Sequence, residues 1–335
     1  MREPAFWYRP PSLASHLLSP LGAIYGAVAA WRMNREGIDA GIPVICVGNF
    51  HTGGAGKTPA TLKISEMLRT DGETPFVVSR GYGGRLTGPV RVDPQIHTAR
   101  DVGDEPLMMS SRVPVIVSRD RAAGAALAKS QGAGVILLDD GFQNPSLRKN
   151  MSLIVVDANR GIGNGFVFPA GSLRAPLKPQ IDKTDALIVV GSGHGTADLE
   201  RSIENRNIPV LQARLKADQR AVSELGAKSV LAFAGIGDPS KFFSTLRENN
   251  ISVAEERVFA DHHAFSIGEI EKLMRDAAKR SLTLLTTEKD IARIRSDPRL
   301  IRFADRIATL PVTLEFDDEA ALSRLVTARL AAARK

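Results

Sequence analysis

One segment, residues 44–59, limits the possible folds of this 335-residue chain more than any other. Residues 44–48 are an apolar run that fits a buried parallel strand, and Lys57 and Thr58 open a stretch with a helical pattern. Between them lies a turn made of Gly53, Gly54, Ala55 and Gly56. A strand, a glycine-rich loop and a Lys-Thr pair at the start of a helix are, in this order, typical of a phosphate-binding loop.

The residue types explain why such a loop binds phosphate. Glycines let backbone N–H groups approach a polyphosphate, and the following helix directs its positive end at the same place. Lys57 can neutralise the β- and γ-phosphates, and Thr58 can bind Mg²⁺. We therefore predict a nucleoside triphosphate site that takes ATP and Mg²⁺. His51 stands where the usual motif has its first glycine, so an ordinary strand-to-helix turn is the alternative.

Composition narrows the class of protein. The length favours two domains, and a hydrophobic content of 43% is typical of a globular chain. A formal net charge of +7 favours anionic partners such as nucleic acid, an acidic lipid surface or a phosphorylated substrate. Cys46 is the single cysteine, which excludes a disulfide framework and a zinc site built on cysteines, and fits a reducing cytosol.

The N-terminal segment is apolar. Residues 17–31 carry no charge, but the run is short for a membrane span and contains Pro20. Aromatic residues surround it, and Arg32 and Arg35 follow it, which favours an interfacial helix that enters one leaflet. A packed amphipathic helix and a cleaved signal peptide are the alternatives. We expect residues 1–40 to be a peripheral membrane anchor.

A second apolar run, residues 135–138, ends in Asp139 and Asp140, which is the Walker B pattern. A carboxylate at this position can hold Mg²⁺ or one of its waters while the metal bridges the phosphates. A surface Asp-Asp-Gly turn is the alternative, but the pair lies downstream of a phosphate-binding loop. The predicted metal ligands are therefore Thr58, Asp139 and Asp140.

Charged residues follow other expected strands as well. Arg80 lies in a glycine-rich loop after the run at residues 74–79, and Arg121 lies just after the run at 113–117. Ligands bind at the carboxyl ends of strands in open α/β sheets, so we expect Arg80 and Arg85 of the first loop near phosphate, with a solvated turn as the alternative. Asp104 begins a helical segment, and its local pattern alone indicates an N-cap.

The order of elements predicts an α/β protein with two domains. Strand and helix patterns alternate through residues 41–215, which predicts a P-loop NTPase-like parallel sheet with helices on both faces. Residues 216–335 predict a smaller second α/β domain with a C-terminal helix. In this part His262 and His263 are adjacent, and on an extended segment they point in opposite directions, which makes a poor metal chelate. A structural role, acid–base catalysis and ligand binding all remain open for them.

Several separated motifs together resemble those of the tetraacyldisaccharide 4'-kinase family, the lipid A kinases of Gram-negative bacteria. The resemblance covers nearly the whole chain. Its Gly-Asp-Glu-Pro, Asp-Asp-Gly-Phe-Gln and Asp-His-His blocks are more specific than a P-loop alone. The segments that carry it are residues 47–59, 79–84, 102–106, 139–143, 169–174, 233–237, 261–263 and 287–290.

The resemblance implies transfer of the ATP γ-phosphoryl group to the 4'-hydroxyl of tetraacyldisaccharide 1-phosphate, which yields lipid IVA. It also implies a peripheral enzyme on the cytoplasmic face of the bacterial inner membrane. The apolar N-terminus and the basic net charge agree with a phosphorylated lipid substrate at an anionic surface. We expect a monomer that binds no nucleic acid.

The same resemblance assigns roles to site residues. It makes Asp104 the base that takes the proton from the sugar hydroxyl, in place of the N-cap role. It makes a histidine of residues 261–263 the partner of this base. We favour His262 and keep His263 as a candidate contact to substrate or phosphate. Arg121 and Arg174 match family arginines near the phosphates and the substrate. A base and a partner on different domains would complete the site only when the domains close.

Two positions depart from the family pattern. His51 and Thr52 stand where members commonly have Thr-Val or Thr-Ala, and Asn144 replaces a histidine that often follows Asp-Asp-Gly-Phe-Gln. Neither change removes a group that the chemistry needs.

Two other functions compete with the kinase. A membrane-associated P-loop switch ATPase is the main alternative, but Thr52 occupies the place of its signature lysine. A nucleic-acid-binding ATPase would need aromatic platforms or a dense basic stripe, whereas aromatic residues are 5% of this chain.

Overall fold

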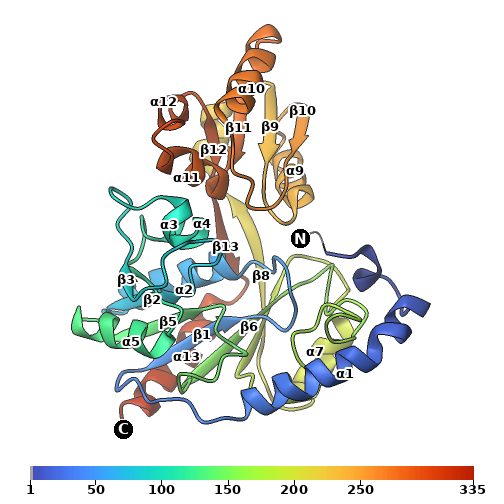
Figure 1. Ribbon diagram of the computed structural model, residues 1–335, viewed down its shortest axis with the longest axis vertical. Helices are drawn as coiled ribbons and strands as arrows, with labels where there is room; N and C mark the ends of the chain where they lie inside the picture. The colour runs from blue at the N-terminus through green and yellow to red at the C-terminus, as the bar shows by residue number, and fades with distance from the viewer. Residues whose placement is uncertain (1–2) are drawn as a thin grey trace.

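The computed structural model describes residues 3–335, and they form a large and a small α/β unit (Figure 1). The large unit contains a nine-stranded sheet in the order β13-β8-β7-β6-β1-β5-β2-β4-β3. Its strands are β1 (Val44–Gly48), β2 (Pro75–Ser79), β3 (Val90–Arg91), β4 (Val115–Val117), β5 (Val135–Asp139), β6 (Met151–Asp157), β7 (Ala186–Val190), β8 (Val210–Ala217) and β13 (Val312–Phe316). The edge strands β3 and β13 are antiparallel to their neighbours, and the other pairings are parallel. The predicted parallel sheet is confirmed.

Both faces of this sheet are covered, which explains why the central strands read as continuous apolar runs. One face packs against α2 (Lys57–Thr70), α4 (Asp104–Met109) and α13 (Glu319–Ala333). The other face packs against α1 (Leu13–Met33), α5 (Arg121–Ser130), α6 (Leu177–Ile181) and α7 (Ala197–Glu204). The short α3 (Ala99–Val102) directly precedes α4.

The register of β1 against β5 positions the nucleotide motifs. Val47 is paired with Asp139, so the chain leaves β1 for the glycine-rich loop beside the two aspartates. The parallel sheet therefore brings the two motifs, which are far apart in sequence, to one edge.

The small unit is a four-stranded parallel sheet in the order β10-β9-β11-β12. Its strands are β9 (Val230–Ala234), β10 (Val253–Val258), β11 (Thr283–Thr287) and β12 (Ala308–Leu310). The helices α10 (Ile267–Lys279), α11 (Glu288–Ser296) and α12 (Ile301–Ala304) share one hydrophobic cluster with it. The helices α8 (Gln219–Leu225) and α9 (Pro239–Glu248) share another. Caps define the starts of two helices of the small unit: Ser266 and Glu269 form a capping box on α10, and Thr287 caps α11.

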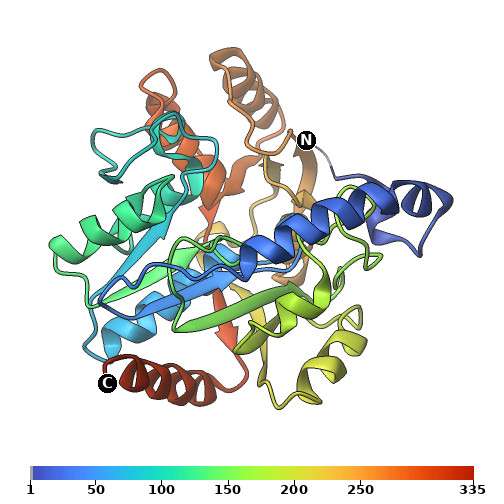
Figure 2. The ribbon, with the colours of Figure 1, turned by 60° about the horizontal axis from the view of Figure 1, so that its bottom comes forward.

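The C-terminal residues correct the predicted domain boundary. Residues 312–335 were expected in the smaller domain, but β13 pairs with β8 and α13 covers the large sheet. Figure 2 shows α13 lying beside α2, and Lys63 and Glu319 form an ion pair between them at 2.9 Å. The chain therefore enters the small unit after β8 and returns to the large unit at β13.

The N-terminal segment forms a 3-10 turn (Ala5–Tyr8) and the 21-residue helix α1. Pro20 lies inside this helix, which continues through it from Leu13 to Met33. Gly22 and Gly26 face the large unit at close range, since a Cβ at Gly22 would lie 2.8 Å from the Val167 carbonyl oxygen. Among the described residues, α1 is the one helix that is long and apolar enough to span a membrane, and 17% of its apolar window is buried. Most of its apolar side chains therefore face outward.

Candidate active site

The glycine-rich loop has the backbone of a phosphate-binding turn. Gly53 and Gly56 adopt φ values of 101° and 90°, which side chains with a Cβ rarely adopt. Gly56 is the N-cap of α2, and Lys57 and Thr58 are its first residues. The Lys57 Nζ lies 3.8 Å from Asp140 Oδ1. The positive end of α2 and the Lys57 ammonium therefore act on the same space beside Asp140.

A loop from residues 166–176 supports the glycine-rich loop from the side. The Thr52 N–H donates to the Ser172 carbonyl at 2.9 Å, and the Arg174 N–H donates to the Phe50 carbonyl at 2.9 Å. These bonds direct the Arg174 guanidinium to Asp140 Oδ1, at 2.6 Å. Arg174 thus lies beside Asp140, next to the glycine-rich loop.

His51, the departure from the usual motif, is fully buried. Its Nδ1 lies 2.6 Å from the Thr52 carbonyl oxygen, so Nδ1 carries the proton of this hydrogen bond. Burial lowers the pKa of His51 to about 4. The imidazole is therefore neutral near pH 7 and adds no charge to the phosphate site.

The two aspartates at the end of β5 have different environments. Asp139 Oδ2 accepts from the Ser79 hydroxyl at 3.1 Å, and Asp139 Oδ1 is buried with no hydrogen-bond partner among the described residues. Burial, with the nearby charges of Glu105 and Asp140, raises the pKa of Asp139 to about 7. Asp140 differs because, against the effect of burial, the charges of Lys57 and Arg174 hold its pKa below the usual range.

These groups fit a hard cation such as Mg²⁺. Thr58, Asp139 and Asp140 offer hydroxyl and carboxylate oxygens, which are the donors that Mg²⁺ prefers. The unpartnered Oδ1 of Asp139 is the observation that supports this fit, because a buried carboxylate oxygen without a donor is costly. Across residues 3–335, no three His, Cys, Asp or Glu side chains cluster as a metal site.

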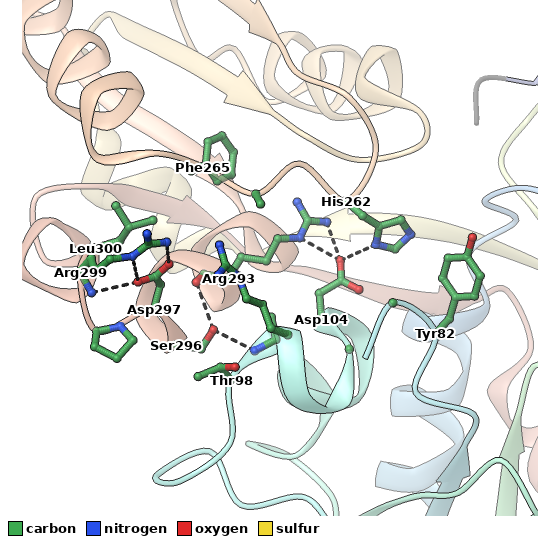
Figure 3. Close-up of a pocket in the computed structure, with 16 residues that line it drawn as sticks. Tyr82, Thr98, Asp104, His262, Phe265, Arg293, Ser296, Asp297, Arg299 and Leu300 are labelled. Atoms are coloured by element: carbon green, nitrogen blue, oxygen red, sulfur yellow. Dashed lines mark hydrogen bonds and ion pairs between the residues drawn. The ribbon is translucent and has the colours of Figure 1, made fainter. Parts of the chain in front are cut away.

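A second group of residues joins the two units, and Figure 3 shows it. Asp104 is the first residue of α4, and its Oδ2 lies 3.0 Å from the His262 Nδ1. The same oxygen accepts from Arg293 Nε at 3.0 Å and from Arg293 Nη2 at 2.5 Å. Asp104 belongs to the large unit, whereas His262 and Arg293 belong to the small unit. The contacts to this carboxylate therefore join the two units. Gly103, not Asp104, is the N-cap of α4.

The electrostatics of this group follow from its geometry. Burial alone would raise the pKa of Asp104, but the hydrogen bond from His262 and the charge of Arg293 hold it well below the usual range. The hydrogen bond to Asp104 in turn raises the pKa of His262. Asp104 is therefore a carboxylate near pH 7, and its charge favours the imidazolium form of His262.

Asp104 and His262 border a cavity of about 490 Å³ between the units. Tyr82, Phe265 and Arg293 are also part of its lining, and Figure 3 shows Tyr82 beside His262. This cavity could admit a polar molecule to the Asp104 carboxylate.

Two more ion pairs join the units next to this cavity. Lys289 pairs with Glu105, and Arg112 pairs with Glu288. Burial would raise the pKa of Glu105, but the charge of Lys289 lowers it. The charge of Glu105 is also one of the causes that raise the pKa of Asp139.

The remaining predicted residues lie in different surroundings. Arg121 is buried and donates to the Asp140 carbonyl at 3.3 Å, and its Nε has no partner among the described residues. Arg80 is exposed. His263 points away from Asp104, since its Nε2 lies 3.1 Å from Glu269 Oε1 and its ring stacks on Phe259. The structure thus gives His263 the structural environment that its sequence context left open.

Sequence reasoning missed Arg293, Lys289 and Glu105 as parts of the site. Lys289 lies within residues 287–290, a segment of the resemblance to which no role was assigned. Glu105 directly follows Asp104 in another such segment, residues 102–106. Arg293 carried no sequence signal beyond its position three residues after Asp290 on a helix.

Comparisons with known proteins show the family and support the fold. The profile of the family described as Tetraacyldisaccharide-1-P 4'-kinase matches residues 14–331. A tetraacyldisaccharide 4'-kinase of Nitrobacter winogradskyi is 58% identical over 335 residues, which cover 100% of this chain and 99% of that protein. One of Bradyrhizobium diazoefficiens is 59% identical over 335 residues, which cover 100% of this chain and 98% of that protein. A crystal structure of the Aquifex aeolicus LpxK in complex with ATP has a TM-score of 0.72 at 24% identity and covers 95% of this chain and 100% of that one, which supports the fold.

Proposed function

The chain belongs to the tetraacyldisaccharide 4'-kinase family, and from this we propose that it transfers the γ-phosphoryl group of ATP to the 4'-hydroxyl of tetraacyldisaccharide 1-phosphate, to form lipid IVA. We propose that it acts as a monomer at the cytoplasmic face of the inner membrane and binds no nucleic acid. The observation that carries the proposal is the pair formed by the buried Asp104 of the large unit and His262 of the small unit, in a fold whose glycine-rich loop places Lys57 beside Asp140.

The phosphate half of the site would stabilise the charge of the transferring group. The backbone of residues 53–56 would cradle the phosphates, and Lys57 would neutralise the β- and γ-oxygens. Arg174 and Arg121 both contact Asp140, so they can add positive charge at the same edge of the sheet. Thr58, Asp139 and Asp140 would hold Mg²⁺, which when bound neutralises charge on the phosphates.

The acceptor half would be built around Asp104. A sugar hydroxyl that enters the cavity can donate to this carboxylate, which is ionised near pH 7 because its pKa is low. In phosphoryl transfer the bond to the leaving group is largely broken before the new bond forms, so a weakly basic carboxylate can take the proton late in the step. The positive charge of His262 would offset part of the negative charge of Asp104 in this pair.

The N-terminal helix would bring the enzyme to its lipid substrate. Leu13, Leu17, Leu21, Ile24 and Val28 of α1 are all more than half exposed, at 76%, 71%, 56%, 66% and 51%. Exposed apolar side chains on a helix favour insertion into the interfacial region of a bilayer. We therefore propose peripheral membrane binding through α1.

A transfer assay tests the proposed reaction. The wild type is incubated with γ-labelled ATP, Mg²⁺ and tetraacyldisaccharide 1-phosphate in detergent micelles, beside the isosteric variant Asp104→Asn. We expect labelled lipid from the wild type and a kcat at least about 10²-fold lower from Asp104→Asn. ATP hydrolysis by the wild type without labelled lipid would instead favour the switch ATPase. A loss confined to KM in Asp104→Asn would make this residue a substrate contact and not a base.

A further inference from the structure

The Arg293 guanidinium is the most fully bonded cation between the two units. Its Nε and Nη2 donate to Asp104 Oδ2, and its Nη1 donates to Asp290 Oδ1 at 2.6 Å and to the Gly235 carbonyl at 2.9 Å. The side chain is 8% exposed. Each guanidinium nitrogen has an acceptor, so the orientation of the planar group is fixed.

Arg293 is itself fixed by Asp290, a residue of the small unit. Asp290 lies one turn earlier on α11 and is fully buried. Its Oδ2 accepts from the Gly235 N–H at 3.0 Å and from the Thr287 hydroxyl at 2.7 Å. A chain of polar contacts thus runs from the end of β11, through Asp290 and Arg293, to Asp104.

These contacts leave the two oxygens of Asp104 in different states. Oδ2 accepts from His262 and twice from Arg293. Among the described residues, Oδ1 accepts only from the neighbouring Glu105 N–H, at 3.0 Å. A carboxylate oxygen has two lone pairs, so Oδ1 retains the capacity to accept one more proton donor.

We propose that Arg293 is a positioning residue for phosphoryl transfer, which holds Oδ2 of Asp104 so that Oδ1 faces the acceptor hydroxyl. The inference rests on the proposed function, because Arg293 acts only through the base. Figure 3 shows the guanidinium reaching Asp104 from the α11 side while His262 reaches the same carboxylate from its other side. Two donors on opposite sides prevent rotation of the carboxylate, and small misplacements of a reacting group are costly in rate.

The competing role for Arg293 is simple adhesion of the two units. The ion pair between Arg112 and Glu288 separates the two roles, because it joins the large unit to the first residue of α11 without a contact to Asp104. Arg112→Ala therefore removes an ion pair between the same units and leaves the base untouched.

The first experiment compares Arg293→Lys with Arg112→Ala in the transfer assay. A lysine keeps the charge, but its single ammonium cannot contact Asp104, Asp290 and Gly235 in the fork geometry of a guanidinium. We expect kcat of Arg293→Lys to fall by about 10- to 100-fold, with KM for ATP and for the lipid within about threefold. Arg112→Ala should keep kcat within about twofold. Equal kcat losses in the two variants would overturn the proposal and favour adhesion.

The second experiment asks whether Arg293 acts through Asp104. Arg293→Lys is combined with Asp104→Asn, and the residual kcat of the double variant is compared with that of Asp104→Asn alone. We expect no further loss, since a positioning residue has no effect once its target is gone. An additional tenfold loss would show a separate role and overturn the proposal.

The third experiment restores the missing group. The cavity of about 490 Å³ borders Arg293, so guanidinium ion can reach the space left in Arg293→Ala. Guanidinium chloride at low millimolar concentration should raise kcat of this variant at least fivefold, and sodium chloride at equal ionic strength should not. If Arg293→Ala does not fold, Asp290→Asn replaces it, because loss of the Asp290 charge weakens the hold on Arg293 and should lower kcat with KM unchanged. A normal kcat in Asp290→Asn, or no rescue in folded Arg293→Ala, would contradict the proposal.

The outcomes distinguish this proposal from the function on which it rests. No labelled lipid from the wild type, or a normal kcat in Asp104→Asn, would refute the proposed function. An active wild type, an impaired Asp104→Asn and a normal Arg293→Lys would refute the positioning role alone.

Discussion

The exposed face of α1 allows a quantitative test of membrane binding. Leu17 and Ile24 are seven residues apart, so they lie on the same face of the helix, and their side chains are 71% and 66% exposed. Full burial of a leucine or isoleucine side chain is worth about 1.5–3 kcal/mol. Scaled by these exposed fractions, the double change Leu17→Ser and Ile24→Ser removes about 3 kcal/mol of transfer free energy. This corresponds to a fall of about 100-fold in the vesicle partition coefficient.

The assay is sedimentation of the full chain with vesicles of phosphatidylethanolamine and phosphatidylglycerol, at a series of lipid concentrations. The matched control is Ile96→Ser with Ile301→Ser, which removes two side chains that are 72% and 55% exposed but lie outside α1. The control should keep the partition coefficient within about twofold of the wild type. Equal partition coefficients for the wild type and the α1 variant would refute the reasoning. An equal fall of the partition coefficient in the control would refute it too, because either result would show that membrane binding does not depend specifically on α1.

Three further predictions concern the site. Lys57→Ala should abolish transfer, because the Lys57 ammonium lies 3.8 Å from Asp140 at the phosphate loop, and near-normal turnover in the labelled assay would remove the phosphate-site assignment. Asp139→Asn should raise the Mg²⁺ concentration for half-maximal rate at least about tenfold, since it removes a carboxylate charge from the predicted ligands, and an unchanged Mg²⁺ titration would exclude this role. The pairing of His262 with Asp104, beside Arg293 and Lys289, raises the pKa of the histidine and lowers that of the carboxyl. The contribution of this pair to the stability of the folded protein should therefore be full between about pH 4 and 6.5. It should be lost as pH rises through the raised pKa of His262, and also as pH falls through the lowered pKa of Asp104. The difference in Tm between wild type and His262→Gln should follow this curve, and a pH-independent difference would contradict it.

The strand, glycine-rich turn and helix start at residues 44–58 were predictable because their signals are local. A buried strand, glycines with positive φ and a helix start lie within one short segment, and the same types of residue produce them in any protein. Predicting that Asp139 and Asp140 lie beside this loop needed one further inference. Once a parallel sheet is assumed, the carboxyl ends of its strands meet at one edge, and the register of Val47 with Asp139 follows that expectation.

The C-terminal tail was misplaced for a physical reason. Leu322, Val326 and Leu330 recur every four residues, which predicts a helix with one apolar face and says nothing about the sheet that this face covers. The preceding strand β13 could extend either sheet by the same hydrogen bonds. Only its antiparallel pairing with β8 assigns the tail to the large unit.

The contact of Arg293 with Asp104 could not be predicted from the local sequence. On the sequence alone, Asp290 and Arg293 form an ordinary i,i+3 pair, and such pairs on helices are usually exposed and weak. In the structure the pair is buried, because the start of α11 docks on the large unit and Glu288, Lys289 and Arg293 each meet a partner there. A helix whose first turns carry charges in several directions cannot expose all of them once one side is covered, so some must find partners across the contact. Charges on several sides of one helix start are therefore a signal for docking between units, and Arg293 is the member of that set whose partner is the proposed base.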